Sequence, residues 1–192
     1  GRMSRRLPSH LLQFSADKKP VVVWNVTSRC NLKCMHCYAA TQGEPQEMDT
    51  GAALAFIDDV AAFGSPVLLF SGGEPFVRPD VLQLARHAAA RGLRVVFSTN
   101  GTLIDAVLAA RIKEIGVSYV GISIDGMESV HDRFRACAGA FRRTLAGIRH
   151  CRDAGVKVGL RMTLTKDNVG ELEAVFDLLE AERIPRICFY HL

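Results

Sequence analysis

The sequence predicts an α/β fold in which parallel strands alternate with helices. Apolar strand-like runs and amphipathic helical segments follow one another along the chain, as in right-handed β–α–β crossovers. The strand-like runs are almost continuously apolar, which is expected of a sheet covered on both faces. Polar and glycine-rich motifs follow several of these runs, where parallel α/β folds bind their ligands. The pattern fits either a doubly wound open sheet or an incomplete barrel.

The apolar runs predict six strands, and no sixth helix follows the last of them before Leu192. We expect the strands at residues 21–26, 67–70, 93–97, 117–124, 156–164 and 186–192. Residues 1–20 carry no such pattern and are expected to form a loosely attached arm. Residues 21–192 are expected to form the core domain.

Between the strands, apolar residues recur at the i, i+3, i+4 and i+7 spacing of a helix with one apolar face. These residues are Leu54, Ile57, Val60 and Phe63; Val107, Leu108, Ile112 and Ile115; Phe141, Leu145 and Ile148; and Leu172, Val175, Phe176 and Leu179. Thr50 and Thr102 occupy the positions of N-caps. Glycines stand where the helices are expected to end, namely Gly64, Gly92, Gly116 and Gly155.

The composition excludes several classes of protein. The 192 residues are 48% hydrophobic and 23% charged, which is typical of a folded globular chain rather than a disordered one. The apolar runs fall far short of the roughly 18 residues needed to cross a bilayer, so no membrane segment is expected. The net charge is +4, with Lys and Arg spread along the chain. We therefore expect no nucleic-acid partner, although the charge suits a small anionic substrate.

Three of the six cysteines form a cluster, in which Cys30, Cys34 and Cys37 have the spacing C-x3-C-x2-C. A structural zinc site normally takes four protein ligands, often from two separated pairs, and the sequence offers no second pair. Three thiolates can instead hold three corners of a [4Fe–4S] cluster and leave one iron open for chemistry. A zinc site completed by His36 and ordinary free thiols are the alternatives. The other cysteines are isolated and are expected to be inert buried thiols: Cys137, Cys151 and Cys188.

A second motif, SGGEP at residues 71–75, follows the second strand. Gly72 and Gly73 allow a ligand to approach the backbone closely, and Glu74 offers a carboxylate to a cation such as an ammonium group. Taken alone, the motif is more simply explained as a turn between strand and helix. Together with the cysteine motif, it favours a ligand site.

With these two motifs, the chain resembles the core of radical S-adenosylmethionine (SAM) enzymes from Pro20 to Leu192. The resemblance implies a partial (β/α)6 barrel and a [4Fe–4S] cluster on the three clustered cysteines. It implies that the open iron takes the amino and carboxylate groups of SAM, and that Gly72, Gly73 and Glu74 hold the amino group. His36 stands at the aromatic position of the family's cysteine motif. Further SAM contacts are carried over to strand ends, at Asn100, Ser123, Asp125, Arg135 and Arg161.

The amino-acid sequence around these motifs is most similar to that of the radical SAM enzymes that modify tetrapyrroles, in particular in heme d1 biosynthesis. This implies a 5′-deoxyadenosyl radical that takes hydrogen from the substrate, and removal of propionate side chains from didecarboxysiroheme. It also implies an electron donor of the flavodoxin or ferredoxin type and a cytoplasmic location, since an open cluster requires reducing conditions. A C-terminal extension with auxiliary-cluster cysteines, usual in this branch, is not found in the 192 residues.

Two other functions stay open on the sequence. One is a radical SAM enzyme that matures a peptide or a peptide-derived cofactor, and the other is a non-catalytic iron–sulfur or zinc protein. Several residues also have two interpretations. His191 could contact the substrate, or it could be solvated or packed. His131 and Asp132 could contribute to the site, or they could form the cap at the start of a helix. A group of arginines could bind substrate carboxylates or form a solvated helix face, namely Arg133, Arg135, Arg142, Arg143 and Arg149.

Overall fold

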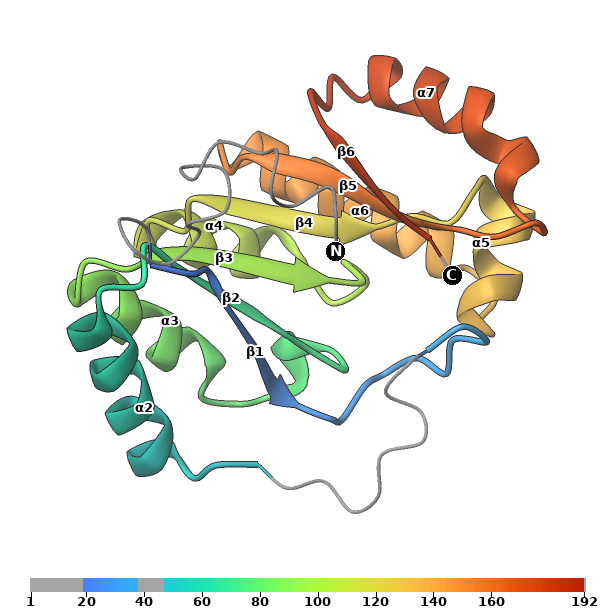
Figure 1. Cartoon of the computed structure of the whole chain (residues 1–192). Coiled ribbons are helices and arrows are strands. Elements are labelled where there is room, and N and C mark those ends of the chain that lie inside the picture. The colour runs from blue at the N-terminus through green and yellow to red at the C-terminus, as the bar shows by residue number, and fades with distance from the viewer. Residues whose placement is uncertain (1–18, 38–46, 192) are drawn as a thin grey trace, which may run out of the picture.

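The computed structural model of the chain describes residues 19–37 and 47–191. These residues form one six-stranded sheet with the strand order β1-β2-β3-β4-β5-β6, and every neighbouring pair is parallel. Because the strands follow chain order, the right-handed crossovers place their helices on one face of the sheet. The fold is therefore the incomplete barrel and not the doubly wound sheet. In the described chain β1 and β6 are the two edges, which lie apart in Figure 1.

The strands lie within two residues of the predicted bounds at each end. They are β1 (Val22–Thr27), β2 (Val67–Gly72), β3 (Arg94–Thr99), β4 (Tyr119–Ser123), β5 (Val158–Leu164) and β6 (Ile187–His191). The α-helices are α2 (Thr50–Phe63), α3 (Val81–Ala90), α4 (Ala106–Ile115), α5 (Glu128–Arg135), α6 (Ala140–Asp153) and α7 (Leu172–Ala181). Two short 3-10 helices are η2 (Pro75–Val77) and η3 (Val169–Glu171). The short helix α5 is an addition to the predicted pattern.

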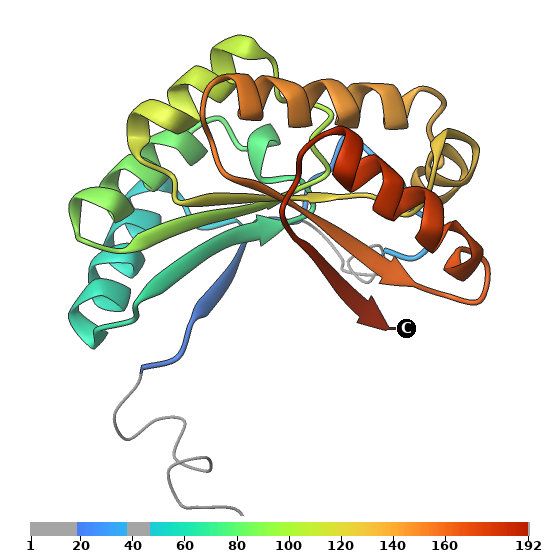
Figure 2. The ribbon, with the colours of Figure 1, turned by 90° about the horizontal axis from the view of Figure 1, so that it is seen from above.

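The hydrophobic core lies between the convex face of the sheet and the helices that cover it (Figure 2). Alternate strand residues such as Leu68, Phe70, Phe97 and Ile122 point outward and are fully buried. The opposite, concave face carries smaller or polar residues, and Val23 on it is 62% exposed. The prediction that both faces are covered is therefore wrong for the concave face, because the sheet curls around a cavity.

Aspartates, and not the predicted threonines, cap two of the helices. Asp49 caps α2 and Asp105 caps α4, each accepting a hydrogen bond from a backbone amide of the first turn, at 2.8 and 2.7 Å. Thr50 donates its hydroxyl hydrogen bond elsewhere, to Asp80 at 2.7 Å. Thr102 precedes α4 by several residues and lies in the site described below.

The predicted glycines do end their helices. Gly64 and Gly116 are the C-caps of α2 and α4 and have φ angles of +83° and +80°, a left-handed conformation that favours glycine. Gly92 and Gly155 follow α3 and α6 directly after the cap residue, with φ of +81° and +72°.

Three residues of the predicted apolar helix faces are exposed: Phe63, Val107 and Phe176. Phe63 is covered in part by Lys19, whose ammonium group lies 4.6 Å from the ring centroid. Pro20 also contacts the fold, since its carbonyl accepts a 2.9 Å hydrogen bond from Ser65. The rest of the predicted N-terminal arm, residues 1–18, lies outside the described residues. In the part of the chain that is described, no helix combines the length and apolar character needed to span a membrane.

Candidate active site

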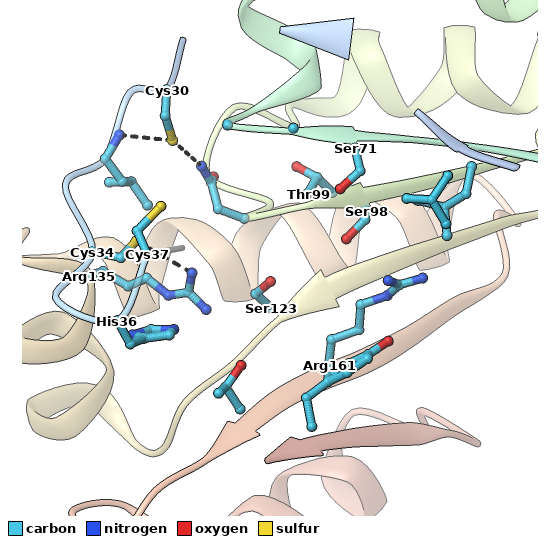
Figure 3. A pocket seen from close by; sticks show the side chains of 18 of the residues that line it. Cys30, Cys34, His36, Cys37, Ser71, Ser98, Thr99, Ser123, Arg135 and Arg161 are labelled. Carbon is cyan, nitrogen blue, oxygen red and sulfur yellow. Dashed lines mark hydrogen bonds between the residues drawn. The ribbon is translucent and has the colours of Figure 1, made fainter. Parts of the chain in front are cut away.

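A cavity of about 540 Å³ opens on the concave face at the carboxyl ends of the strands (Figure 3). Its size lies in the usual range for cofactor and substrate sites, ~300–1,000 Å³. Ten of the twelve predicted site residues line it: Cys30, Cys34, His36, Cys37, Gly72, Gly73, Asn100, Ser123, Arg135 and Arg161. The two others, Glu74 and Asp125, lie behind its wall. The placement follows from the parallel topology, which brings the ends of all strands to one edge.

The three clustered cysteines lie on the loop that follows β1. Cys30 is exposed, whereas Cys34 and Cys37 are half-buried. The loop turns between the latter two, where the Cys37 amide donates to the Cys34 carbonyl at 3.2 Å. The Met35 amide donates to the Phe134 carbonyl at 2.9 Å and so ties the loop to α5. Figure 3 shows the three thiols facing the strand ends across the cavity.

The three described thiols are not placed to share a single metal ion. Among the described residues, no group of three His, Cys, Asp or Glu side chains is placed to hold one ion. A zinc ion needs its ligand atoms about 2.0–2.3 Å away, so the alternative of a zinc site completed by His36 has no support here. Desolvation and, less strongly, the nearby Glu74, Cys34 and Cys37 charges raise the pKa of the Cys30 thiol. A bound cation is what allows such grouped thiols to ionise together.

The two glycines of the second motif bring the cysteine loop against β2. A Cβ atom at Gly72 would lie 2.2 Å from the Thr27 carbonyl oxygen, and one at Gly73 would lie 2.3 Å from that of Arg29. The Gly73 amide donates to Thr27 at 2.8 Å, and the next amide donates to Arg29 at 2.9 Å. The two glycines are expected to let a ligand approach the backbone closely. On this side, the backbone of the residues that precede Cys30 occupies that space instead.

Glu74 is fully buried and connects the loops that follow β2 and β3. Its carboxylate accepts hydrogen bonds from the Thr99 hydroxyl at 2.7 Å, the Asn100 amide at 2.8 Å and the Phe76 amide at 3.2 Å. Desolvation outweighs these donors and raises the pKa of Glu74 to about 7. The carboxylate does not line the cavity. Its direct contact with the amino group of SAM stays a prediction, and its observed contacts are those of a residue that shapes the wall.

Asp125 also acts from behind the cavity wall. Its carboxylate lies 2.8 Å from Nε of Arg135 and 3.7 Å from Nε2 of His36, and it is only 1% exposed. Nη1 of Arg135 in turn donates to the sulfur of Cys34 at 3.6 Å. Burial lowers the pKa of His36, which favours a neutral ring beside the carboxylate. Asp125 thus places a cationic hydrogen-bond donor next to Cys34, a predicted cluster ligand.

Asn100 holds the cysteine loop from the end of β3. Its amide nitrogen donates to Oδ1 of Asn31 at 2.9 Å and approaches the Cys30 sulfur at 3.9 Å. Its oxygen accepts from the Thr102 amide at 2.9 Å, and Asn31 donates to the Thr102 hydroxyl at 2.8 Å. Sequence analysis missed Asn31, although its position directly after Cys30 is the signal that could have found it.

Comparison with known proteins decides the family. Residues 24–179 match the radical SAM superfamily. The chain belongs to this superfamily. Radical SAM enzymes use a [4Fe–4S] cluster and SAM, so the predicted class of enzyme and its two cofactors are confirmed. The non-catalytic alternative is thereby rejected.

The relatives of this radical SAM chain include several with names from tetrapyrrole synthesis, as the resemblance predicted. It is 58% identical to the Fe-coproporphyrin III synthase of Methanosarcina barkeri over 100% of its own length and 49% of that protein. It is 44% identical to the pre-heme d1 synthase of Dinoroseobacter shibae over 91% of its own length and 44% of that protein. The chain thus spans about half the length of these relatives. Of these two relatives, the Fe-coproporphyrin III synthase has the higher identity to this chain.

Solved structures confirm the fold of this radical SAM core. Streptococcus suis SuiB bound to S-adenosylmethionine matches with a TM-score of 0.78 and 16% identity, over 89% of this chain and 40% of that one. The enzyme anSMEcpe with bound AdoMet and Kp18Cys peptide matches with a TM-score of 0.77 and 19% identity, over 89% and 50%. The predicted partial barrel is confirmed by this likeness.

Two residues next to the radical SAM site have structural roles. His131 is fully buried and its Nδ1 accepts a 3.2 Å hydrogen bond from the Asp125 amide. Desolvation lowers the pKa of His131 to about 3, so the ring is a neutral support. Asp132 accepts from the Gly139 and Phe141 amides at 2.6 and 2.7 Å, and thus caps the start of α6.

The remaining sequence expectations divide between the cavity and the surface. His191 lines the cavity and Cys151 is buried, with a thiol pKa raised to about 12 by desolvation. Cys137 and Cys188 are half-buried, so the expectation of buried thiols is wrong for these two. Of the arginine group, only Arg135 lines the cavity. The others lie on helix surfaces: Arg133, Arg142, Arg143 and Arg149. Of these, Arg142 pairs with Glu128 and Arg149 pairs with Glu182.

Proposed function

We propose that this chain is the radical SAM core of an enzyme that modifies the carboxylate-bearing side chains of an iron tetrapyrrole. The cavity carries the proposal, because it has the cysteine loop at one end and, among the described residues that line it, no Asp or Glu. Two arginines and two histidines line it instead, which favours an anionic substrate. The names of the two tetrapyrrole relatives support the same substrate class.

In this proposal each part of the site has a separate task. Cys30, Cys34 and Cys37 hold three irons of the cluster. When bound, the cluster supplies the electron that cleaves SAM reductively. Arg135 donates a hydrogen bond to a cluster sulfur ligand, and hydrogen bonds and charge of this kind tune cluster potentials. The strand ends orient SAM and the concave wall keeps water from the reacting atoms.

The electron is proposed to come from a small reducing protein of the flavodoxin or ferredoxin type. Cys30 is exposed, so the cysteine loop reaches the surface of the described chain, where such a donor can approach. Removal of propionate side chains from didecarboxysiroheme, the heme d1 reaction, is the second candidate. The 44% identity to pre-heme d1 synthase supports this second candidate. The first candidate is the formation of Fe-coproporphyrin III, because the identity to Fe-coproporphyrin III synthase is higher, at 58%.

The test is anaerobic turnover of the reconstituted full-length protein with SAM, dithionite and didecarboxysiroheme. We expect 5′-deoxyadenosine to form, and the tetrapyrrole to change mass to that of an Fe-coproporphyrin III standard. A product with the mass of pre-heme d1 would establish the second candidate. Formation of 5′-deoxyadenosine with no change in the tetrapyrrole, but with change in a peptide substrate, would refute the proposed substrate class.

A further inference from the structure

Two glycines lie next to each other on the concave face of the sheet, away from the cysteine loop. Gly121 of β4 and Gly159 of β5 are partners in the parallel register. A Cβ atom at Gly121 would lie 2.2 Å from Nε of Arg161, and one at Gly159 would lie 2.2 Å from the hydroxyl of Tyr119. The side chain of Arg161 therefore lies across β4, and that of Tyr119 lies across β5. The glycine pair makes room for both side chains against the sheet.

Both side chains carry polar atoms that lack partners. Nε of Arg161 and the hydroxyl of Tyr119 are buried without a hydrogen-bond partner among the described residues. Such groups are rare in folded proteins, because water is lost and no bond replaces it. Arg161 also has no ion pair within residues 19–37 and 47–191. An unpaired guanidinium on a cavity wall is a binding group for an anion.

No acidic side chain of the described residues forms an ion pair that would balance the charge of Arg161. The cavity contains a second arginine, Arg135, but the charge of that one is balanced by Asp125. In contrast, the cavity neighbours of Arg161 on the strands, such as Ser123 and Thr163, are neutral. Tyr119 and Arg186 line a second, neighbouring cavity, in which the Arg186 guanidinium lies 5.7 Å from the centroid of the Tyr119 ring.

The two cavity arginines also differ in position. Arg135 contacts Cys34, whereas Figure 3 shows the Arg161 guanidinium beyond Ser123, on the side away from the cysteines. We propose that Arg161, with Tyr119 packed on the same face of the sheet, forms a subsite for a peripheral carboxylate of the tetrapyrrole substrate, and that Arg161 does not contact SAM. Guanidinium and carboxylate pair through two parallel hydrogen bonds. This inference rests on the proposed tetrapyrrole function.

The test compares binding of Fe-coproporphyrin III and of its tetramethyl ester, which lacks the carboxylates, to the reconstituted full-length holoenzyme. Absorbance titrations give both affinities, and calorimetry gives the affinity for SAM. We expect Arg161→Met to weaken binding of the acid about 10- to 100-fold and to leave binding of the ester unchanged. Tyr119→Phe, which removes only the buried hydroxyl and keeps the ring, is expected to change acid binding by less than about 3-fold. Neither variant should change the affinity for SAM.

The matched control is Arg142→Met, which removes a guanidinium that is 78% exposed and paired with Glu128. It should bind acid, ester and SAM as the parent does. If Arg161→Met does not fold, Arg161→Lys decides the question, since it keeps the charge but loses the planar fork and should weaken acid binding several-fold.

Three results would overturn the inference. Unchanged acid binding in the Arg161 variants would show that no carboxylate pairs there. A loss of SAM affinity without loss of acid affinity would make Arg161 a SAM contact. Failure of the parent protein to bind either tetrapyrrole would refute the proposed function itself and this inference with it. This outcome is distinguished from failure of the inference alone, because it is seen in the parent protein without any variant.

Discussion

Nε of Arg135 lies 2.8 Å from the carboxylate of Asp125, and both side chains are buried, with exposures of 9% and 1%. The same guanidinium donates to the sulfur of Cys34 at 3.6 Å. Asp125 comes from the turn after β4, Arg135 from the end of α5 and Cys34 from the loop after β1. The pair therefore joins three distant segments of the chain at the cluster site, and it balances one positive charge inside the cavity wall.

Asp125→Asn should uncouple this arrangement. Breaking one side of a buried ion pair costs about 3–5 kcal/mol in the free energy of unfolding, because the arginine charge stays buried without its partner. We also expect SAM cleavage to slow by about 10-fold while the iron content is kept, since Asp125 positions a residue and holds no metal. Denaturant unfolding and 5′-deoxyadenosine formation measure the two effects.

The control for the ion pair is Glu128→Gln, which breaks the exposed pair with Arg142 and should cost at most about 1 kcal/mol. We expect the reduction potential of the cluster to shift in Asp125→Asn and not in Glu128→Gln. A purely structural role of Asp125 would leave this potential unchanged. Full activity and potential in Asp125→Asn would contradict the positioning role.

Glu74 predicts a specific pH dependence of stability. Desolvation raises its pKa in the folded protein from 4.5 to about 7. A carboxyl group with a raised folded pKa is stabilising in its protonated form below the unfolded value, and this contribution is lost as pH rises through the folded value. The free energy of unfolding of the parent should therefore contain a fall of a few kcal/mol between about pH 4.5 and pH 7, from about 1.4 kcal/mol per pKa unit.

The variant Glu74→Gln removes this titration. It should be less stable than the parent, because its amide nitrogen faces donors that need an acceptor. Its deficit should shrink as pH rises from 4.5 to 7, since only the parent loses stability through this group. Denaturant midpoints across that range give the difference, and a constant deficit would show that Glu74 does not titrate there.

The order of strands and helices could be predicted because it depends on local patterns. Apolar runs and helical spacing are properties of neighbouring residues, and the parallel topology then brings strand ends such as Ser123 and Asn100 together. The choice between adjacent helix caps could not be predicted. Asp49 caps α2 because Thr50 is engaged by Asp80, which lies 30 residues away in sequence.

The direction of a side chain was also beyond the sequence. The motif at residues 71–75 shows that a carboxylate stands near the site, but not that Glu74 is buried and hydrogen-bonded to Thr99 and Asn100. The position of Asn31 directly after Cys30 is a signal, but its role depends on Asn100 from β3, a contact that the sequence alone does not show. The subsite of Arg161 depends likewise on a register that pairs two glycines across neighbouring strands.

Gly73→Ala should disturb the cysteine loop directly. The added Cβ would lie 2.3 Å from the backbone oxygen of Arg29, which cannot move without moving the loop that leads to Cys30. We expect iron incorporation and SAM cleavage to fall strongly, with a loss of about 1–3 kcal/mol in the free energy of unfolding. Gly170→Ala is the matched control, because a Cβ atom there meets nothing within 4 Å. Equal iron contents in the two variants would contradict the role given to the glycine motif.

Replacement of Cys30, Cys34 or Cys37 by alanine should abolish the cluster. In the proposed site each thiolate would hold one of three irons, and two thiolates would leave two corners without protein ligands. After anaerobic reconstitution the parent should contain about four irons per chain and make 5′-deoxyadenosine, whereas each variant should be nearly free of iron and inactive. Cys137→Ala is the control, since this thiol lies on the surface side beside Arg143, whose nitrogen is 3.1 Å away. A variant of one clustered cysteine that kept full iron and full SAM cleavage would show that this cysteine is not a ligand.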